Sequence, residues 1–154
     1  MDYNALLVAA GVYAATFVIC FTGGVVPLVN SEIYLASLVY LFPASNFFFI
    51  LFLAVVAQMI AKGLVYLAGM GIITLPFKRY RKTEAILARA DRLRKKPDLV
   101  VFISSLSGFP PFYIISFLGG ILKIHFIRFI VAGTIGMLIR FSVLLFGVTL
   151  LLKN

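Results

Sequence analysis

Long apolar runs dominate the chain and predict its main elements. Three of them, at about residues 5–22, 47–75 and 126–152, carry few charged side chains. An α-helix needs about 20 consecutive apolar residues to cross the hydrocarbon core of a bilayer. Each run is therefore expected to form a membrane-spanning helix.

The apolar stretch at 27–43 is too short to span. It begins at Pro27 and continues through Asn30 and Ser31, which are good residues for capping a helix N-terminus. The apolar part that follows covers about 15 Å as a helix, which is half of a bilayer. A short, capped helix of this kind is typical of a re-entrant or broken element.

A second interrupted stretch lies at 99–122. Gly108, Pro110 and Pro111 fall in its middle, where a continuous helix would lose backbone hydrogen bonds. Each half of the chain thus pairs an interrupted stretch with a full-length helix. Such pairs at corresponding positions of two halves point to a binding site in mid-membrane. We expect an all-α bundle with two interrupted or re-entrant segments in pseudo-inverted halves.

Composition agrees with a membrane environment. Hydrophobic residues make up 63% of the 154 residues and charged residues only 12%, and the mean hydropathy is +1.12. Soluble domains are about 25% charged. The chain is therefore expected to be an integral membrane protein that forms one membrane domain over residues 1–154.

The net charge of +9 is concentrated between residues 76 and 97. Nucleic-acid binding by such a basic patch is disfavoured against a short cytoplasmic loop that obeys the positive-inside rule. Apolar residues recur there at helical spacing, which predicts an amphipathic helix on the anionic inner leaflet. With this loop inside, the N-terminus is also expected inside. The basic residues expected to bind the membrane surface are Lys78, Arg79, Arg81, Lys82, Arg92, Arg94, Lys95 and Lys96.

Three ionisable residues lie within apolar surroundings: Glu32, Lys62 and Arg140. Each costs about 2.5–3.5 kcal/mol at the centre of a membrane helix. Glu32 is the one acid placed to pair with the two cations. It either complements the N-terminal dipole of its short helix or acts as a proton carrier or headgroup partner.

Lys62 shares one helix face with Gln58 and Tyr66, at spacings of four residues. This polar face either lines a site or lets Lys62 reach an interface. Arg140 lies on a stripe of small residues, which lets a neighbouring helix approach and turns Arg140 into the bundle. A structural ion pair with Glu32 and a functional role are both open for it. The small residues are Gly133, Gly136 and Gly147.

Two cations and one acid at depth favour an anionic group. Arginine offers bidentate hydrogen bonds to a phosphate and lysine offers a point charge. The N-termini of the half-helices at Ser31 and near Phe112 add backbone donors.

Bond chemistry has little support in the sequence. Cys20 and His125 are the single cysteine and histidine, which do not make a protein zinc site. The sequence shows no nucleophile–base arrangement and no phosphate-cradling loop. We expect no cofactor, no metal and no catalytic residue.

Four motifs resemble the DedA family, also called VTT or SNARE-associated Golgi proteins, in its short YqaA-like branch. The first and most specific contains Asn30, Ser31 and Glu32. They are, in order, PLVNSEIYL at 27–35, AKGLVYLAG at 61–69, FPP at 109–111 followed by FLGG at 117–120, and GMLIRF at 136–141.

The resemblance covers about residues 21–146. It implies two opposed re-entrant loops, lipid scrambling or flipping, a location in the cell (inner) membrane, and links to undecaprenyl phosphate and the proton-motive force. Glu32 matches the family's re-entrant acid and Arg140 the final-helix arginine of the branch. Many relatives carry arginines beside the Phe-Pro break. Here the neighbouring residues are uncharged, and Lys62 is expected to substitute.

The sequence therefore predicts a lipid transporter or scramblase. It would move an anionic phospholipid or polyprenyl-phosphate headgroup between leaflets, with proton coupling and homo-oligomerisation left open. Two alternatives stand beside it: a small proton-coupled solute transporter, and a structural membrane protein that recruits partners through its basic loop.

Overall fold

The computed structural model describes residues 3–26, 29–41, 46–71 and 93–153, and this part of the chain contains helices and no strands. Two helices are long and apolar enough to cross a membrane: α3 (Phe47–Gly69) and the Phe126–Leu151 part of α7 (Phe126–Lys153). The expected all-α membrane fold is confirmed. Residues 72–75 of the predicted middle span lie outside the described part.

Four more helices complete the described fold. They are α1 (Tyr3–Val25), α2 (Ser31–Leu41), α5 (Pro97–Ser107) and α6 (Phe112–Ile121). The break between α5 and α6 falls at the glycine and prolines that interrupt the apolar pattern. Gly108 ends α5 in the left-handed conformation, with φ of 73°, and Pro111 stands directly before α6.

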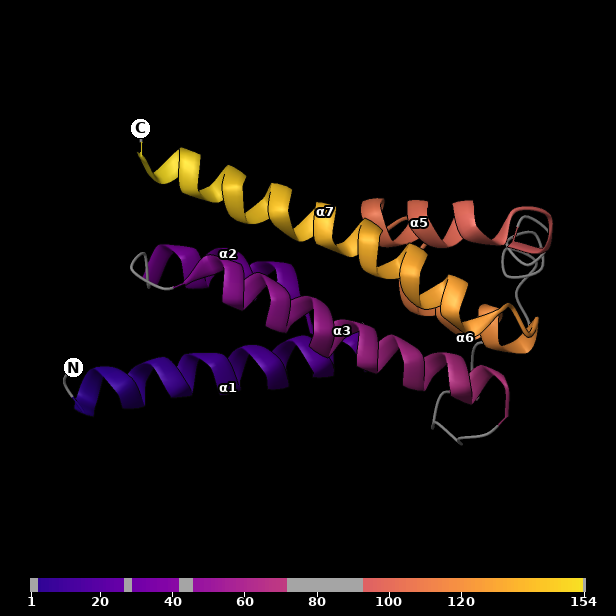
Figure 1. The fold of residues 1–154 in the computed structure, drawn as a ribbon. Helices are drawn as coiled ribbons and strands as arrows, with labels where there is room; N and C mark the ends of the chain where they lie inside the picture. The colour runs from indigo at the N-terminus through magenta and orange to yellow at the C-terminus, as the bar shows by residue number, and fades with distance from the viewer. Residues whose placement is uncertain (1–2, 27–28, 42–45, 72–92, 154) are drawn as a thin grey trace.

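The helices form two hairpins that enter the molecule from opposite ends (Figure 1). α1 runs from one end to the middle and α2 returns to the same end. α5 and α6 do the same from the other end. The long helices α3 and α7 run the full distance in opposite directions between these ends.

Packing contacts repeat between the two halves. α1 packs on α3 and α5 packs on α7, whereas the short returning helices cross over, so that α2 packs on α7 and α6 packs on α3. The arrangement brings one end of each of the four hairpin helices, α1, α2, α5 and α6, to the middle of the molecule (Figure 1). Because the short helix of each half packs on the long helix of the other half, neither half is a separate unit.

The direction of α1 corrects one expectation from the sequence. Tyr13 packs against Phe49, and Gly24 lies against Gln58 and Ala61, so α1 and α3 run parallel. The first turn of α1 therefore lies at the end where α3 begins, not at the end where α3 leads toward the basic segment. The last turn of α1 lies against the middle of α3, a position that length and hydropathy do not reveal.

Glycines allow the closest helix crossings. A Cβ on Gly120 would overlap the backbone of Tyr66, and a Cβ on Gly136 would overlap Ser105 Oγ and lie 2.8 Å from the Phe102 carbonyl. Gly147, the third member of the predicted stripe, faces open space. The stripe is therefore a packing surface over the first half of α7, and its extension to Gly147 is wrong.

Most of the basic segment lies outside the described residues. Lys78, Arg79, Arg81, Lys82 and Arg92 belong to that group, as does Pro27. Of the residues that follow, Leu93 is fully buried, whereas Arg94, Lys95 and Lys96 are exposed. The exposed cations lie just before α5, at the end of the molecule opposite the chain termini (Figure 1).

Candidate functional site

A polar cavity of about 340 Å³ lies where the two hairpins meet. Its walls come from the α1–α2 junction, the middle of α3, the α5–α6 break and the middle of α7. Six of the sequence-predicted site residues line it: Asn30, Ser31, Glu32, Gln58, Lys62 and Arg140.

Glu32 is fixed by the start of α2. The Asn30 side chain caps this helix, because its Oδ1 accepts hydrogen bonds from the backbone N–H groups of Glu32, at 2.9 Å, and Ile33, at 3.3 Å. The Glu32 carboxylate forms an ion pair with the Arg140 guanidinium. Glu32 lies in the first turn of α2, where an acidic side chain complements the positive end of the helix dipole.

Lys62 binds the C-terminal end of a helix, α1, whereas Glu32 lies at the N-terminal end of α2. Only 6% of this residue is exposed, and its Nζ donates a hydrogen bond of 2.7 Å to the carbonyl of Gly24, in the last turn of α1. The last carbonyls of a helix lack intrahelical donors and carry partial negative charge. The Nζ also lies 5.9 Å from the centroid of the Phe112 ring. A buried ammonium group is thereby stabilised without a carboxylate of its own.

Arg140 reaches the break in the second hairpin. Its guanidinium lies against Gly108, where a Cβ would sit 2.7 Å from one terminal nitrogen. The cation beside the Phe-Pro break is thus Arg140 from α7, and Lys62 lies near the same break through Phe112. The expected substitution by Lys62 alone is incomplete because sequence spacing does not reveal which distant helix faces the break.

Gln58 joins the start of α2 to α3. Its amide nitrogen donates a hydrogen bond of 2.6 Å to Ser31 Oγ, and both residues are buried. Gly23 and Gly24 make room for this contact, because a Cβ on Gly23 would overlap Ser31 Oγ and one on Gly24 would lie 3.1 Å from Gln58 Oε1. Gln58 and Lys62 thus line the cavity and also hold its walls through hydrogen bonds to Ser31 and Gly24.

Tyr66 does not belong to the cavity. Its hydroxyl donates to the carbonyl of Ile124, and its ring packs against Phe126 and Phe129. It lies on the same face of α3 as Gln58 and Lys62, but one turn beyond the cavity. Its assignment as a site residue from spacing is therefore not supported by its position.

The sequence did not indicate Gly24 as a site residue, and it predicted Gly108 as a helix break without its contact to Arg140. Gly24 supplies the carbonyl that binds Lys62, and Gly108 leaves the space that Arg140 fills. The signal was present, since both glycines lie at the end of a helix that enters an interrupted stretch. Pro111 also lines the cavity directly, whereas Pro110 contributes its carbonyl to a 2.6 Å hydrogen bond from Ser104 Oγ.

Each of the three charged side chains of the cavity lies at a helix end of opposite partial charge. Lys62 and Arg140 each lie at the carbonyl end of the first helix of a hairpin, and Glu32 lies at the amide end of α2. With Lys62 protonated, two cations and one carboxylate leave a net positive charge around a cavity of ligand size. Among the described residues, no group of three or more metal-binding side chains is present. The geometry suits the binding of one anionic group.

Comparison with known proteins identifies the family. No curated protein and no solved structure matches the chain. A family model described as the VTT domain matches residues 26–150, which includes α2, α3, α5, α6 and most of α7. Proteins of this family are membrane-associated and often linked to lipid transport. The chain belongs to the VTT domain family, also known as the DedA family.

Proposed function

We propose that this protein moves lipids with an anionic headgroup between the two leaflets of a membrane. The observation that carries the proposal is the meeting of Glu32, Lys62 and Arg140 around one cavity between the hairpins. Three ionisable groups in apolar segments are costly. Their convergence favours a shared task over three separate structural roles.

The headgroup phosphate binds between Lys62 and Arg140 in this proposal. It replaces the Glu32 carboxylate as the partner of the Arg140 guanidinium, which offers two parallel hydrogen bonds to phosphate oxygens. The start of α2 supplies a positive dipole end beside it. The headgroup thereby crosses the apolar layer without exposing its charge to acyl chains.

Proton coupling follows from the same ion pair. Glu32 and the headgroup compete for Arg140. Protonation of Glu32 removes its charge and releases Arg140 to the phosphate, and loss of the proton restores the ion pair and expels the headgroup. Directional movement would then draw on a proton gradient.

We further propose that the hairpins are re-entrant loops and that the basic segment is cytoplasmic. The positive-inside rule places clustered cations on the cytoplasmic side. The start of α1 and the end of α7 would then both face the other side, because they lie at the opposite end of the molecule (Figure 1).

Purified protein in liposomes containing fluorescent phosphatidylglycerol tests the proposal. A membrane-impermeant quencher destroys the label in the outer leaflet, and continued loss of signal measures exchange between leaflets. Lys62→Gln and Arg140→Gln are each expected to slow exchange about tenfold or more, the effect of losing roughly 1.4 kcal/mol of stabilisation of the crossing state. Arg128→Gln, an exposed arginine on the same helix α7, is the matched control.

Three results would count against this proposal. Unchanged exchange in the Glu32→Gln/Arg140→Gln double variant would remove the cavity from the transport path. Uptake of a soluble solute driven by a pH gradient, with no lipid exchange by the unaltered protein, would favour a solute transporter instead. Loss of function on deletion of residues 79–96 with no effect of Glu32→Gln would favour a recruiting role for the basic segment.

A further inference from the structure

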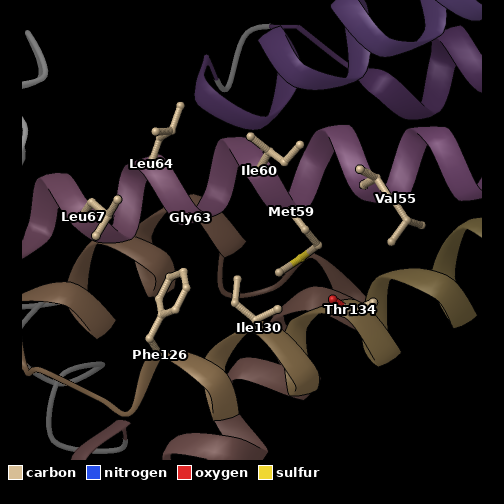
Figure 2. A pocket seen from close by; sticks show the side chains of 10 residues that line it. Val55, Met59, Ile60, Gly63, Leu64, Leu67, Phe126, Ile130 and Thr134 are labelled. Carbon is tan, nitrogen blue, oxygen red and sulfur yellow. The ribbon is translucent and has the colours of Figure 1, made fainter.

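A second, apolar groove of about 430 Å³ lies between α3 and α7 (Figure 2). Gly63, which has no side chain, lines the groove on α3 together with Met59. Phe126 and Ile130 line it on α7. Thr134 supplies the single polar side chain among the lining residues. Both helices that form the groove are long and apolar enough to cross a membrane, so we expect the groove to face the hydrocarbon layer.

The groove and the polar cavity share a thin partition. Phe112 lines the polar cavity, Met59 lines the groove, and the two side chains meet at Gly133 of α7. A Cβ on Gly133 would lie 2.9 Å from Phe112 Cζ and 3.0 Å from Met59 Cε. The side chains of Phe112 and Met59 therefore both lie against Gly133, between the groove and the polar cavity.

Neighbouring residues of α3 face the two compartments in turn. Met59 and Gly63 line the groove, whereas Gln58 and Lys62 line the polar cavity. A molecule with a charged end at Lys62 and a hydrocarbon end at Gly63 would therefore meet matching chemistry over one turn of helix. A lipid has this division of charge and hydrocarbon.

We propose that the apolar groove holds an acyl chain of the same lipid whose headgroup enters the polar cavity, and that Met59 and Phe112 form the movable partition between them. The proposal rests on the proposed function and adds where the chain of the transported lipid lies. Met59 suits a movable wall because its unbranched thioether adopts many shapes. Hydrocarbon gains little by moving from lipid to an apolar protein surface, so the groove sets position and contributes little to affinity.

Photo-crosslinking tests the location of the chain. The protein is reconstituted with phosphatidylglycerol or phosphatidylcholine that carries a photoreactive group in its acyl chain, and adducts are mapped by mass spectrometry. We expect phosphatidylglycerol to label Ile130 and Thr134 several-fold more than phosphatidylcholine does, and this preference to disappear in Lys62→Gln. Val143 and Phe146, exposed on another part of α7, are the control positions and are expected to label equally with both lipids.

Equal labelling of the groove by both lipids, unaffected by Lys62→Gln, would show ordinary surrounding lipid and overturn the proposal. This outcome is distinct from failure of the proposed function, which is read from leaflet exchange. Headgroup-dependent labelling without exchange would support the binding site and reject transport.

A filled groove gives a second measurement. Gly63→Leu places a side chain where a Cβ would have only Phe126 at 3.8 Å, so the bulk enters the groove. It is expected to slow lipid exchange about tenfold while leaving the binding of glycerol phosphate, which has no acyl chain, unchanged. Gly147→Leu, on a helix surface with no neighbour within 4 Å, is the matched control. Unchanged exchange in folded Gly63→Leu would contradict the proposal.

Discussion

Gly108 meets two requirements at one residue. Its backbone φ of 73° lies in the left-handed region, and its missing side chain leaves the space occupied by the guanidinium of Arg140. A non-glycine residue in this conformation costs roughly 1–2 kcal/mol. The space left by the missing side chain lets the Arg140 guanidinium lie against the end of α5.

Gly108→Ala is expected to lower stability by more than the backbone cost alone and to displace Arg140 from the cavity. Gly71→Ala separates the two effects, because Gly71 has φ of 82° but no neighbour within 4 Å. Thermal unfolding in detergent should show a loss of roughly 1–2 kcal/mol for Gly71→Ala and a larger loss for Gly108→Ala. Leaflet exchange should fall only in Gly108→Ala, and equal effects of the two variants on both measurements would argue against the Arg140 contact.

The Glu32–Arg140 ion pair predicts non-additive effects on stability. The side chains of Arg140 and Glu32 are 27% and 33% exposed, so the loss on breaking the pair should fall below the roughly 3–5 kcal/mol of a fully buried one. Glu32→Gln and Arg140→Gln should each destabilise the protein, because each leaves one uncompensated charge. The double variant should be less destabilised than the sum, with a coupling of about 0.5–3 kcal/mol. Strict additivity in thermal unfolding would contradict a direct interaction.

The interaction partner of a residue could be predicted from the sequence where few residues of the required chemical type were present. Glu32 was the one acid in an apolar segment, so its pairing with one of the two cations in apolar segments followed from the sequence. The partner of Lys62 did not follow, because it is a backbone carbonyl, and every residue has one. The position of Tyr66 outside the cavity did not follow either. Its hydroxyl also binds a carbonyl, and helical spacing cannot tell which carbonyl lies opposite.

At the scale of single helices, α7 shows how one apolar pattern hides two environments. Gly133 and Gly136 lie against other helices, whereas Gly147 has no neighbour within 4 Å. All three share a stripe, so the sequence predicted one packing surface. The difference arises because α5 is only 11 residues long and covers only part of α7.

Gly136→Ala and Gly147→Ala should therefore change stability in opposite directions. A methyl group at Gly136 meets the backbone and side chain of α5 and should cost about 1–3 kcal/mol through overpacking. The same change at Gly147 should be neutral or stabilise by up to about 1 kcal/mol, because alanine favours a helix over glycine. Unfolding midpoints of the two variants in one detergent test this. A comparable loss in both would mean that α7 packs differently from the described arrangement.

Helix boundaries at the interruptions were also predictable. Gly108 and the prolines after it end one helix and begin the next because no continuous hydrogen-bond ladder can pass them. The sequence did not reveal which part of the molecule the end of α1 contacts. Its apolar run resembled a crossing helix, and only contact with Gln58 and Ala61 reveals that it ends in the middle of the molecule.

At the scale of the whole molecule, the crossed packing of the hairpins determines which ends lie together. The start of α1 and the end of α7 lie at one end of the molecule, and Arg94, Lys95 and Lys96 lie toward the other (Figure 1). The sequence supplied the elements and their charges. It did not indicate this arrangement, because the spacing of apolar residues in α1 is the same whether α1 packs parallel or antiparallel to α3.

Cysteine labelling in intact membranes tests the arrangement. With buried Cys20 replaced by alanine, Leu151→Cys and Lys96→Cys introduce reporters at exposed positions. A membrane-impermeant maleimide applied from one side should label one reporter and not the other, and both should react after solubilisation. Labelling of both reporters from the same side of sealed membranes would contradict the described topology.

The polar face of α3 has a mechanical consequence. Gln58 binds the start of α2, Lys62 binds the end of α1, and Tyr66 binds the segment before α7. All three attachments lie along one line on a single helix. A turn of α3 about its axis would strain them together, whereas sliding one hairpin would break only some of them. Rearrangements that open the molecule should therefore proceed by shifts of individual hairpins around a stationary α3.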